Sequence, residues 1–199
     1  MRATTLLTAL ILLTAFASIS LAALPMRPYS GIGVLQLNNT SLNHALHLYE
    51  EPGLLRNGTL NPAAVRQFTD WLFGAGDDLH LLVTARKGEW LKVEHDDAGR
   101  ESWLHAPPRG TYTPWELFLK GKEISFLRNA PRHQLQMYAR PGGAPLNPVT
   151  STTPMRVILV QHDWCYVLFD QSSAGWIRWR DQDSRLLVGL SPPAISQSR

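Results

Sequence analysis

Short apolar runs separated by polar turns dominate the chain beyond its N-terminal segment. Some runs alternate apolar and polar positions and others are continuously apolar, and both patterns at this length predict β-strands. Polar turns stand beside these runs, as hairpins require. The clearest runs are residues 79–84, 90–94, 156–161 and 164–169. The pattern therefore predicts a mainly β protein with a meander of about five strands in each half.

One helix is predicted inside the first half from its capping residues. Asn61 suits the N-cap and Pro62 the first helical position, and Gly74 suits the end. Between them, one helical face carries the apolar side chains Val65, Phe68 and Leu72.

A second short helix is predicted between the two halves. Thr113 and Glu116 have the spacing of a capping box, with Pro114 at the first helical position, and Gly121 closes the segment. Residues 113–121 are therefore interpreted as a helical linker.

The N-terminal segment has the pattern of a secretory signal peptide. Arg2 supplies a positive charge, residues 6–16 are apolar, and Ser20, Leu21 and Ala22 form a small-x-small cleavage site. Residues 1–22 are thus predicted to be removed, which indicates a periplasmic or secreted protein. The alternative is an uncleaved membrane anchor over residues 3–24, which lack charge.

The chain also repeats itself. Leu48-Tyr49-Glu50-Glu51-Pro52-Gly53 recurs as Met137-Tyr138-Ala139-Arg140-Pro141-Gly142. Further along, Trp90-Leu91-Lys92-Val93 recurs as Trp164-Cys165-Tyr166-Val167, and Trp103-Leu104 recurs as Trp176-Ile177. The order of the blocks is preserved, so the sequence indicates an internal duplication.

Each copy resembles the bacterial SH3-like (SH3b) domains of cell-envelope proteins. The resemblance is carried by the Leu-Tyr-x-x-Pro-Gly block, a central apolar strand, Trp-x-x-Val and a final Trp-hydrophobe pair. The second copy keeps the family's Gly175-Trp176-Ile177 ending, whereas the first has Ser102 before Trp103 and a long insertion over residues 54–78.

This resemblance implies two tandem small SH3-like β-barrels, with a short helix inserted in the first and a helical linker between them. The implied organisation is a signal peptide over 1–22, a first SH3-like domain over 31–108, a linker over 113–121, a second SH3-like domain over 122–190 and a flexible tail over 191–199.

The resemblance also implies a binding role, because such domains bind peptides or cell-wall material. The implied ligand grooves are lined by Tyr49 and Trp90 in the first copy and by Tyr138 and Trp164 in the second. The alternative is that these four rings fill the barrel cores. Trp103 and Trp176 are predicted to be core residues, since Leu104 and Ile177 follow them.

Composition and charge narrow the function classes. The 19 basic and 16 acidic side chains are too balanced to require a nucleic acid or another polyanion as partner. Cys165 is the single cysteine, so no intramolecular disulfide can form, and its place on an apolar strand predicts burial. The histidines are scattered, and the sequence nominates no metal site, no cofactor and no catalytic residue.

The sequence therefore favours a non-catalytic envelope binding or scaffold protein that recognises peptide or peptidoglycan-type ligands through aromatic grooves. The alternative is a structural or assembly subunit of an envelope protein complex. A hydrolase with an unrecognised site is a third hypothesis. No stable membrane span is expected after signal cleavage, and the oligomeric state stays open.

Overall fold

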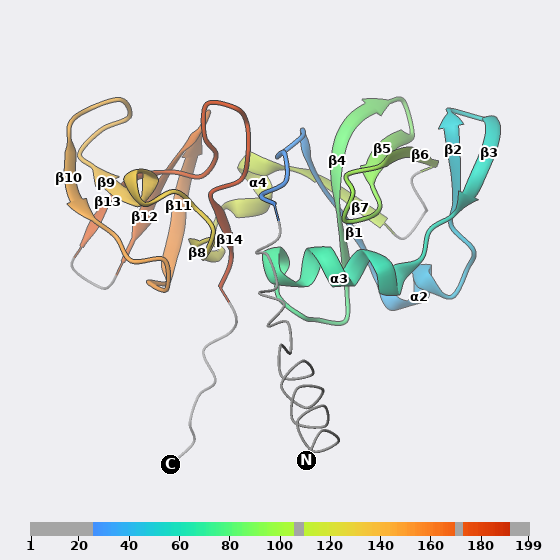
Figure 1. Cartoon of the computed structure of the whole chain (residues 1–199), viewed down its shortest axis with the longest axis horizontal. Coiled ribbons are helices and arrows are strands. Elements are labelled where there is room, and N and C mark those ends of the chain that lie inside the picture. The colour runs from blue at the N-terminus through green and yellow to red at the C-terminus, as the bar shows by residue number, and fades with distance from the viewer. Residues whose placement is uncertain (1–25, 106–109, 170–172, 192–199) are drawn as a thin grey trace, which may run out of the picture.

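The protein is mainly β. The computed structural model describes residues 26–105, 110–169 and 173–191. These residues form two antiparallel sheets of seven strands each, together with short helices (Figure 1). The predicted signal peptide and, apart from Ser191, the predicted tail lie outside the described residues. Of the described helices, none has the length and apolar character needed to cross a bilayer.

The first sheet contains the strands of the N-terminal half in the order β3-β2-β6-β5-β4-β1-β7. Its strands are β1 (Gly33–Leu37), β2 (His47–Glu51), β3 (Leu54–Thr59), β4 (Leu79–Lys87), β5 (Trp90–Glu94), β6 (Glu101–His105) and β7 (Gly110–Pro114).

The second sheet has the order β10-β9-β13-β12-β11-β8-β14. Its strands are β8 (Glu123–Phe126), β9 (Gln136–Tyr138), β10 (Pro145–Pro148), β11 (Met155–Gln161), β12 (Trp164–Leu168), β13 (Ala174–Arg178) and β14 (Val188–Leu190).

The two sheets have the same strand order once the strands of each half are counted from its own start. Tyr49 lies on β2 and Tyr138 on β9, which are corresponding strands. Trp90 and Trp164 likewise begin the corresponding strands β5 and β12. The repeat found in the sequence therefore extends to the topology.

The prediction of two tandem SH3-like β-barrels is not confirmed, because the sheets are not closed. Each half has seven strands where the sequence pattern predicted about five. In the first sheet β3 and β7 are the edges, in the second β10 and β14 are, and among the described residues no pairing joins the two edges of either sheet. The additional strand β7 comes from residues placed between the copies, and it pairs with the far side of β1.

The helix predicted after Asn61 is confirmed as α3 (Pro62–Phe73). The Asn61 side chain accepts hydrogen bonds from the backbone N–H groups of Ala63 and Ala64, at 3.1 and 3.4 Å. This satisfies two N–H groups that have no partner within the helix. The helix ends at Gly74, as predicted.

The predicted capping box after residue 112 is wrong. The linker helix is α4 (Trp115–Leu119), and its N-cap is Pro114, without a side-chain hydrogen bond. Thr113 belongs to β7 instead, where it lies opposite Val34 of β1. Sheet pairing therefore replaces the expected cap. Two further short elements, α2 (Asn39–Leu42) and the 3-10 helix η1 (Arg132–Gln134), were not predicted.

A shared hydrophobic core joins the two halves. Strand β1 is an apolar run buried on both faces, as continuous apolar strands are. Leu35 packs in a cluster within the first half, whereas Val34 packs in a larger cluster with the second sheet. Helices α3 and α4 contribute Leu72 and Trp115 to the same larger cluster. The halves are therefore packed together through a common core.

The segment before β1 ties the first half to the second. The Arg27 guanidinium lies 2.8 Å from the Asp181 carboxylate. Burial alone would raise the pKa of Asp181, but hydrogen bonds from the Arg185 backbone N–H and from Arg27 hold that pKa below its ordinary value. The Ser30 N–H also donates to the Ser184 carbonyl, at 2.8 Å.

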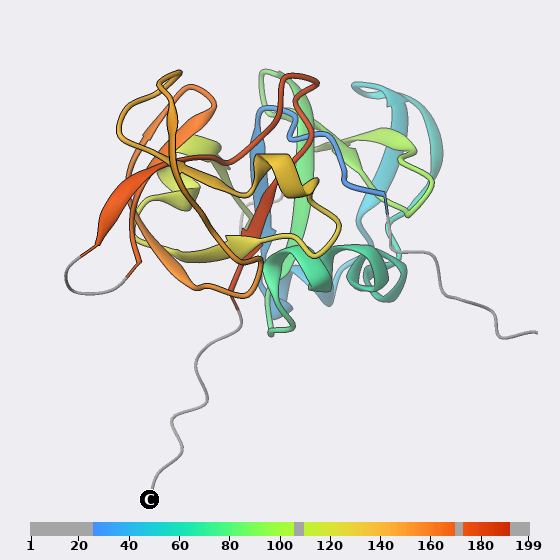
Figure 2. The ribbon, with the colours of Figure 1, turned by 60° about the vertical axis from the view of Figure 1, so that its left-hand side comes forward.

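Helix α3 approaches β14 closely at Gly189 (Figure 2). A Cβ atom at Gly189 would lie 2.6 Å from the Leu72 carbonyl oxygen and 3.0 Å from Leu127 Cδ2. Backbone can approach this closely only where the side chain is a hydrogen atom. Gly189 therefore sets the distance between the inserted helix and the second sheet.

We expect Gly189→Ala to lower the free energy of unfolding by about 1–3 kcal/mol, because the added methyl group forces α3 and β14 apart. Urea unfolding followed by circular dichroism measures the change. Gly76→Ala is the matched control, since nothing lies within 4 Å of a Cβ at that position. Equal unfolding midpoints for the two variants would contradict this account of the packing.

Candidate functional site

Strands β5 and β6 present opposite faces of different chemistry. Leu91, Val93 and Leu104 point into the hydrophobic cluster of the first half. Because side chains alternate along a strand, the residues between them point to the other face. The motif Trp90 is therefore on the face turned away from that cluster.

Cross-strand register gathers five side chains on this outer face. Trp90 lies opposite His105, and Trp103 lies opposite both Lys92 and Tyr49. Residues directly opposite each other in antiparallel strands share a face. We call this group the first aromatic face, and it consists of Tyr49, Trp90, Lys92, Trp103 and His105.

The second half repeats the arrangement. Cys165, Val167 and Ile177 are fully buried in the shared core. On the opposite face, Trp164 lies opposite Arg178, and Trp176 lies opposite both Tyr166 and Tyr138. We call this group the second aromatic face, and it consists of Tyr138, Trp164, Tyr166, Trp176 and Arg178.

The two faces correspond position by position. Trp90 and Trp164 begin corresponding strands, and each lies opposite a side chain that can carry positive charge, His105 or Arg178. The strands bearing the first face lie toward one end of the molecule and those bearing the second lie toward the other (Figure 1). The duplication has therefore produced two equivalent outer surfaces that are widely separated.

The structure brings together the predicted Tyr and Trp in each copy. The ring centroids of Tyr49 and Trp90 are 5.2 Å apart, with the ring planes at 85°. Those of Tyr138 and Trp164 are 5.0 Å apart, with the planes at 87°. This edge-to-face geometry is favoured between aromatic rings, and it limits the orientation of both partners.

A basic side chain also packs against the Trp of each pair, His105 against Trp90 and Arg178 against Trp164. The His105 and Trp90 ring centroids are 5.0 Å apart, and the Arg178 Cζ lies 4.6 Å from the Trp164 centroid. The second contact is a cation–π interaction. Trp164 is consequently only 8% exposed, whereas Trp90 is half-buried and more accessible.

The turn that follows Tyr49 borders the first face. Gly53 has the positive φ expected of this turn, 74°, and a Cβ there would lie 3.9 Å from the Trp90 ring. The next residues, Leu54 and Leu55, are 67% and 68% exposed. Leu55 has a φ of 40°, a left-handed conformation that is uncommon and costly for a bulky residue.

Trp103 is buried, as predicted for a core residue, whereas Trp176 is only half-buried and does not fit that prediction. Trp103 is 9% exposed and Trp176 is half-buried, yet neither belongs to a hydrophobic core cluster. The residues after them, Leu104 and Ile177, are the ones that point into the cores. Strict alternation along the strand would have identified this difference. It would also have found Tyr166, which packs on Trp176 at 5.4 Å.

Ser102, His95 and Asp96 adjoin one another in the order of a catalytic triad, but their geometry does not fit one. Ser102 Oγ is 3.2 Å from His95 Nε2, whereas His95 Nδ1 is 3.9 Å from the Asp96 carboxylate. The second distance is too long for a hydrogen bond. Asp96 instead accepts from the N–H groups of Ala98 and Arg100. Ser102 is 3% exposed and therefore poorly accessible to a substrate. The bonds of Asp96 stabilise the turn between β5 and β6.

The remaining chemistry-bearing groups are dispersed or buried. Cys165 is fully buried, as predicted, and burial raises the pKa of its thiol. A thiol in such surroundings is a poor nucleophile. In the part of the chain that the structure describes, no three His, Cys, Asp or Glu side chains gather as a metal site.

The two halves also differ at the cross-strand pair that follows each face. Glu94 lies directly opposite Glu101 in the first half, where the second half has Leu168 opposite Ala174. Burial, Glu101 and Asp96 together raise the pKa of Glu94 to about 7. Like charges at directly opposed positions repel. The first half therefore carries at this pair one carboxyl group, that of Glu94, whose pKa lies near neutral pH.

No protein-family model and no curated protein matches the chain. Among solved structures, one titled "Endolysin LysPBC5 CBD" is 14% identical and aligns with 83% of this chain and 98% of its own, at a TM-score of 0.26. A TM-score this low does not establish a common fold. The function is therefore inferred from the two aromatic faces themselves.

We expect Glu94→Gln to flatten the pH dependence of stability. The pKa of Glu94 is about 7 in the folded chain and ordinarily 4.5, so its contribution is present below pH 4.5 and is lost as the pH rises through 7. The variant should therefore exceed the wild type in stability above pH 7. Urea unfolding between pH 4 and 8 tests this, with the exposed Glu50→Gln as control. Parallel curves for wild type and Glu94→Gln would contradict it.

Proposed function

We propose that this chain is a non-catalytic binding protein of the cell envelope, whose two aromatic faces recognise peptide or peptidoglycan-type ligands. The observation that carries the proposal is the repetition of a Tyr–Trp pair at matching registers of two sheets. In each sheet the pair lies on the face turned away from the hydrophobic core clusters, to which none of the four rings belongs. Repetition of the pair at this position favours a shared binding task.

The composition of the faces suits such ligands. Flat rings held edge to face offer a large contact area and lose little rotamer entropy on binding. Arg178 adds positive charge to the second face, and carboxylates of peptides or wall polymers pair well with such a group. In the first face Lys92 is paired with Glu101, at 2.9 Å. The exposed Leu54 lies opposite Glu51, on the face of β2 that carries Tyr49, and it enlarges the apolar part of the first face. Rings next to cations match a ligand that combines apolar and acidic groups.

Two faces at opposite ends of the molecule favour a repetitive or polymeric ligand. Binding at one face raises the effective concentration of ligand at the other, so two weak sites give strong overall binding. This advantage exists only if the ligand spans both faces. A wall polymer with repeating units meets that requirement.

The proposal includes two SH3-like domains over residues 31–108 and 122–190, joined by a linker over 113–121. Its support is the matching strand order of the two halves. It further places the mature protein in the periplasm or outside the cell, after removal of residues 1–22. Support for that location comes from the signal-like N-terminal sequence.

We expect Trp90→Leu and Trp164→Leu each to weaken binding to polymeric peptidoglycan by about 100-fold or more, because either change removes one of two linked sites. Binding of a short muropeptide should fall only about twofold, since one site is left. Cosedimentation measures the first quantity and calorimetric titration the second.

Tyr29→Leu is the control, because Tyr29 is an exposed ring outside both faces. The double variant Trp90→Leu/Trp164→Leu should bind neither ligand. Wild-type binding by a folded double variant would refute the proposal.

A second candidate function is assembly with another envelope protein through the sheet edges. Strands β3 and β10 are edge strands, and they carry the exposed side chains Leu54, Leu55 and Leu146. Edge strands with exposed apolar residues readily pair with another chain. Corresponding edges therefore offer two docking positions.

We expect Leu54→Cys and Leu146→Cys, exported in the native host, to form crosslinks to a partner through a thiol-specific crosslinker. Cys165 is fully buried and does not interfere. Lys120→Cys, exposed and outside both edges, should give none. Identical crosslinking patterns at all three positions would exclude edge-directed assembly.

A further inference from the structure

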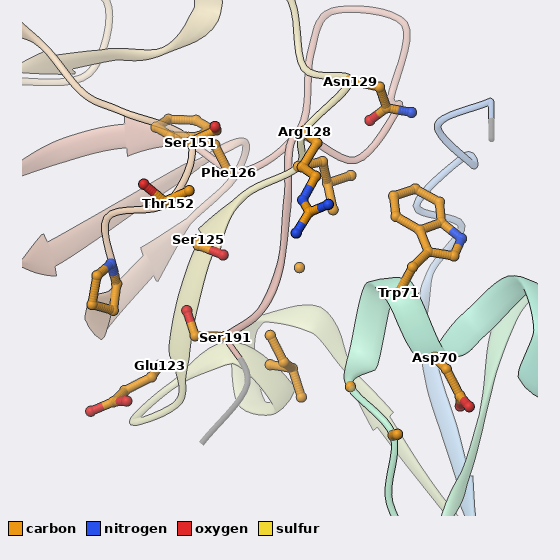
Figure 3. A pocket seen from close by; sticks show the side chains of 16 residues that line it. Asp70, Trp71, Glu123, Ser125, Phe126, Arg128, Asn129, Ser151, Thr152 and Ser191 are labelled. Carbon is orange, nitrogen blue, oxygen red and sulfur yellow. The ribbon is translucent and has the colours of Figure 1, made fainter. Parts of the chain in front are cut away.

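A cleft of about 740 Å³ lies between the inserted helix α3 and the second sheet (Figure 3). This volume falls in the usual range of small-molecule sites. Residues from α3 and its end form one wall, with Trp71 as its aromatic member, and β8 and β14 form the other. Among the described residues, the second copy has no helix at the position of α3. The cleft is therefore not a product of the duplication.

The cleft combines one aromatic ring, apolar groups and several hydroxyl groups. Phe126 and Leu190 supply apolar surface beside Trp71. The hydroxyl-bearing side chains come from three separate segments, and they are Ser125, Ser151, Thr152 and Ser191. A pocket that mixes an aromatic wall with many hydrogen-bonding groups suits a ligand whose faces alternate C–H and hydroxyl groups.

Arg128 supplies the positive charge of the cleft. Its side chain is exposed and projects between Trp71 and Ser125 toward the centre (Figure 3). Among the described residues it takes part in no ion pair. Asp70 and Glu123 also line the cleft, but their carboxylates point away from its centre in the same view. The guanidinium group of Arg128 is therefore available to pair with a carboxylate of the ligand.

A peptide strand is a poorer fit than a sugar. Peptides usually bind sheets by pairing with a free strand edge. Here β8 is already paired on both sides, with β11 and β14. The edge strand β14 is packed against α3, since Gly189 lies against the Leu72 carbonyl. No free strand edge is therefore offered inside the cleft.

We propose that this cleft binds an acidic saccharide, with a sugar ring against Trp71, the ligand carboxylate on Arg128 and the sugar hydroxyls on the Ser and Thr side chains. The site is separate from both aromatic faces. It does not depend on the function proposed for them.

The test uses the full mature chain and two oligosaccharides that differ in charge. Hyaluronan tetrasaccharide alternates glucuronic acid with N-acetylglucosamine, whereas chitotetraose contains N-acetylglucosamine alone. Nuclear magnetic resonance titration follows the amides of Gly189 and Leu190 and the indole N–H of Trp71. We expect saturable shifts of these signals with the acidic sugar and at least tenfold weaker binding of the neutral one.

Arg128→Gln should weaken binding of hyaluronan tetrasaccharide by about tenfold or more, as loss of a charged hydrogen bond does. Arg132→Gln is the matched control, because Arg132 is exposed in the same half but does not line the cleft. The Trp90→Leu/Trp164→Leu chain should retain the shifts at Gly189. This result would separate a failure of the proposed aromatic faces from a failure of the proposed cleft site.

Three outcomes would overturn the proposal. Hyaluronan tetrasaccharide could cause no saturable shift at the cleft signals. Arg128→Gln and Arg132→Gln could bind it equally well. An acetylated tetraglutamate peptide could bind more tightly at the same amides, which would make the cleft a peptide site.

Discussion

A buried pair of tryptophans holds the two halves of this molecule together. Trp115 and Trp179 lie 5.3 Å apart between ring centroids, inside the core that both sheets share. Each indole N–H is satisfied, by the Ser30 carbonyl at 2.6 Å and by the His162 carbonyl at 2.7 Å. Without those bonds, burial of two indoles would be costly. The shared core thus has a defined geometry as well as a large apolar area.

That core determines where binding surfaces can lie. Apolar side chains on the inner face of each sheet pack in the core. The aromatic side chains that alternate with these apolar residues along the strands therefore point to the other face. The halves meet through β1, α3, α4 and the segment around Arg27. The strands that carry Tyr49 and Tyr138 consequently lie toward opposite ends of the molecule (Figure 1). One packing arrangement therefore accounts for two separated faces and for the cleft between α3 and the second sheet.

The features predicted from sequence are those specified locally. Asn61 and Gly74 define α3 by capping, and the repeated blocks around Tyr49 and Tyr138 indicate the duplication. Features that depend on distant segments were missed or misassigned. Thr113 joins β7 because β1 is available as a partner, and the Trp71 cleft exists only where α3 meets the second sheet. Alternation along β13 places Trp176 on the face opposite the core residue Ile177, so its incomplete burial follows from the local pattern.

Burial of Cys165 affects how the chain withstands an oxidising environment. The Cys165 side chain is fully buried among the apolar groups of the shared core. This burial raises the pKa of its thiol, which therefore stays protonated. Thiolate is the form that oxidants and disulfides attack. Oxidation of this thiol and mixed disulfides can therefore occur only in molecules whose core has opened. Because Cys165 is the single cysteine, a disulfide-linked dimer marks chains that have unfolded.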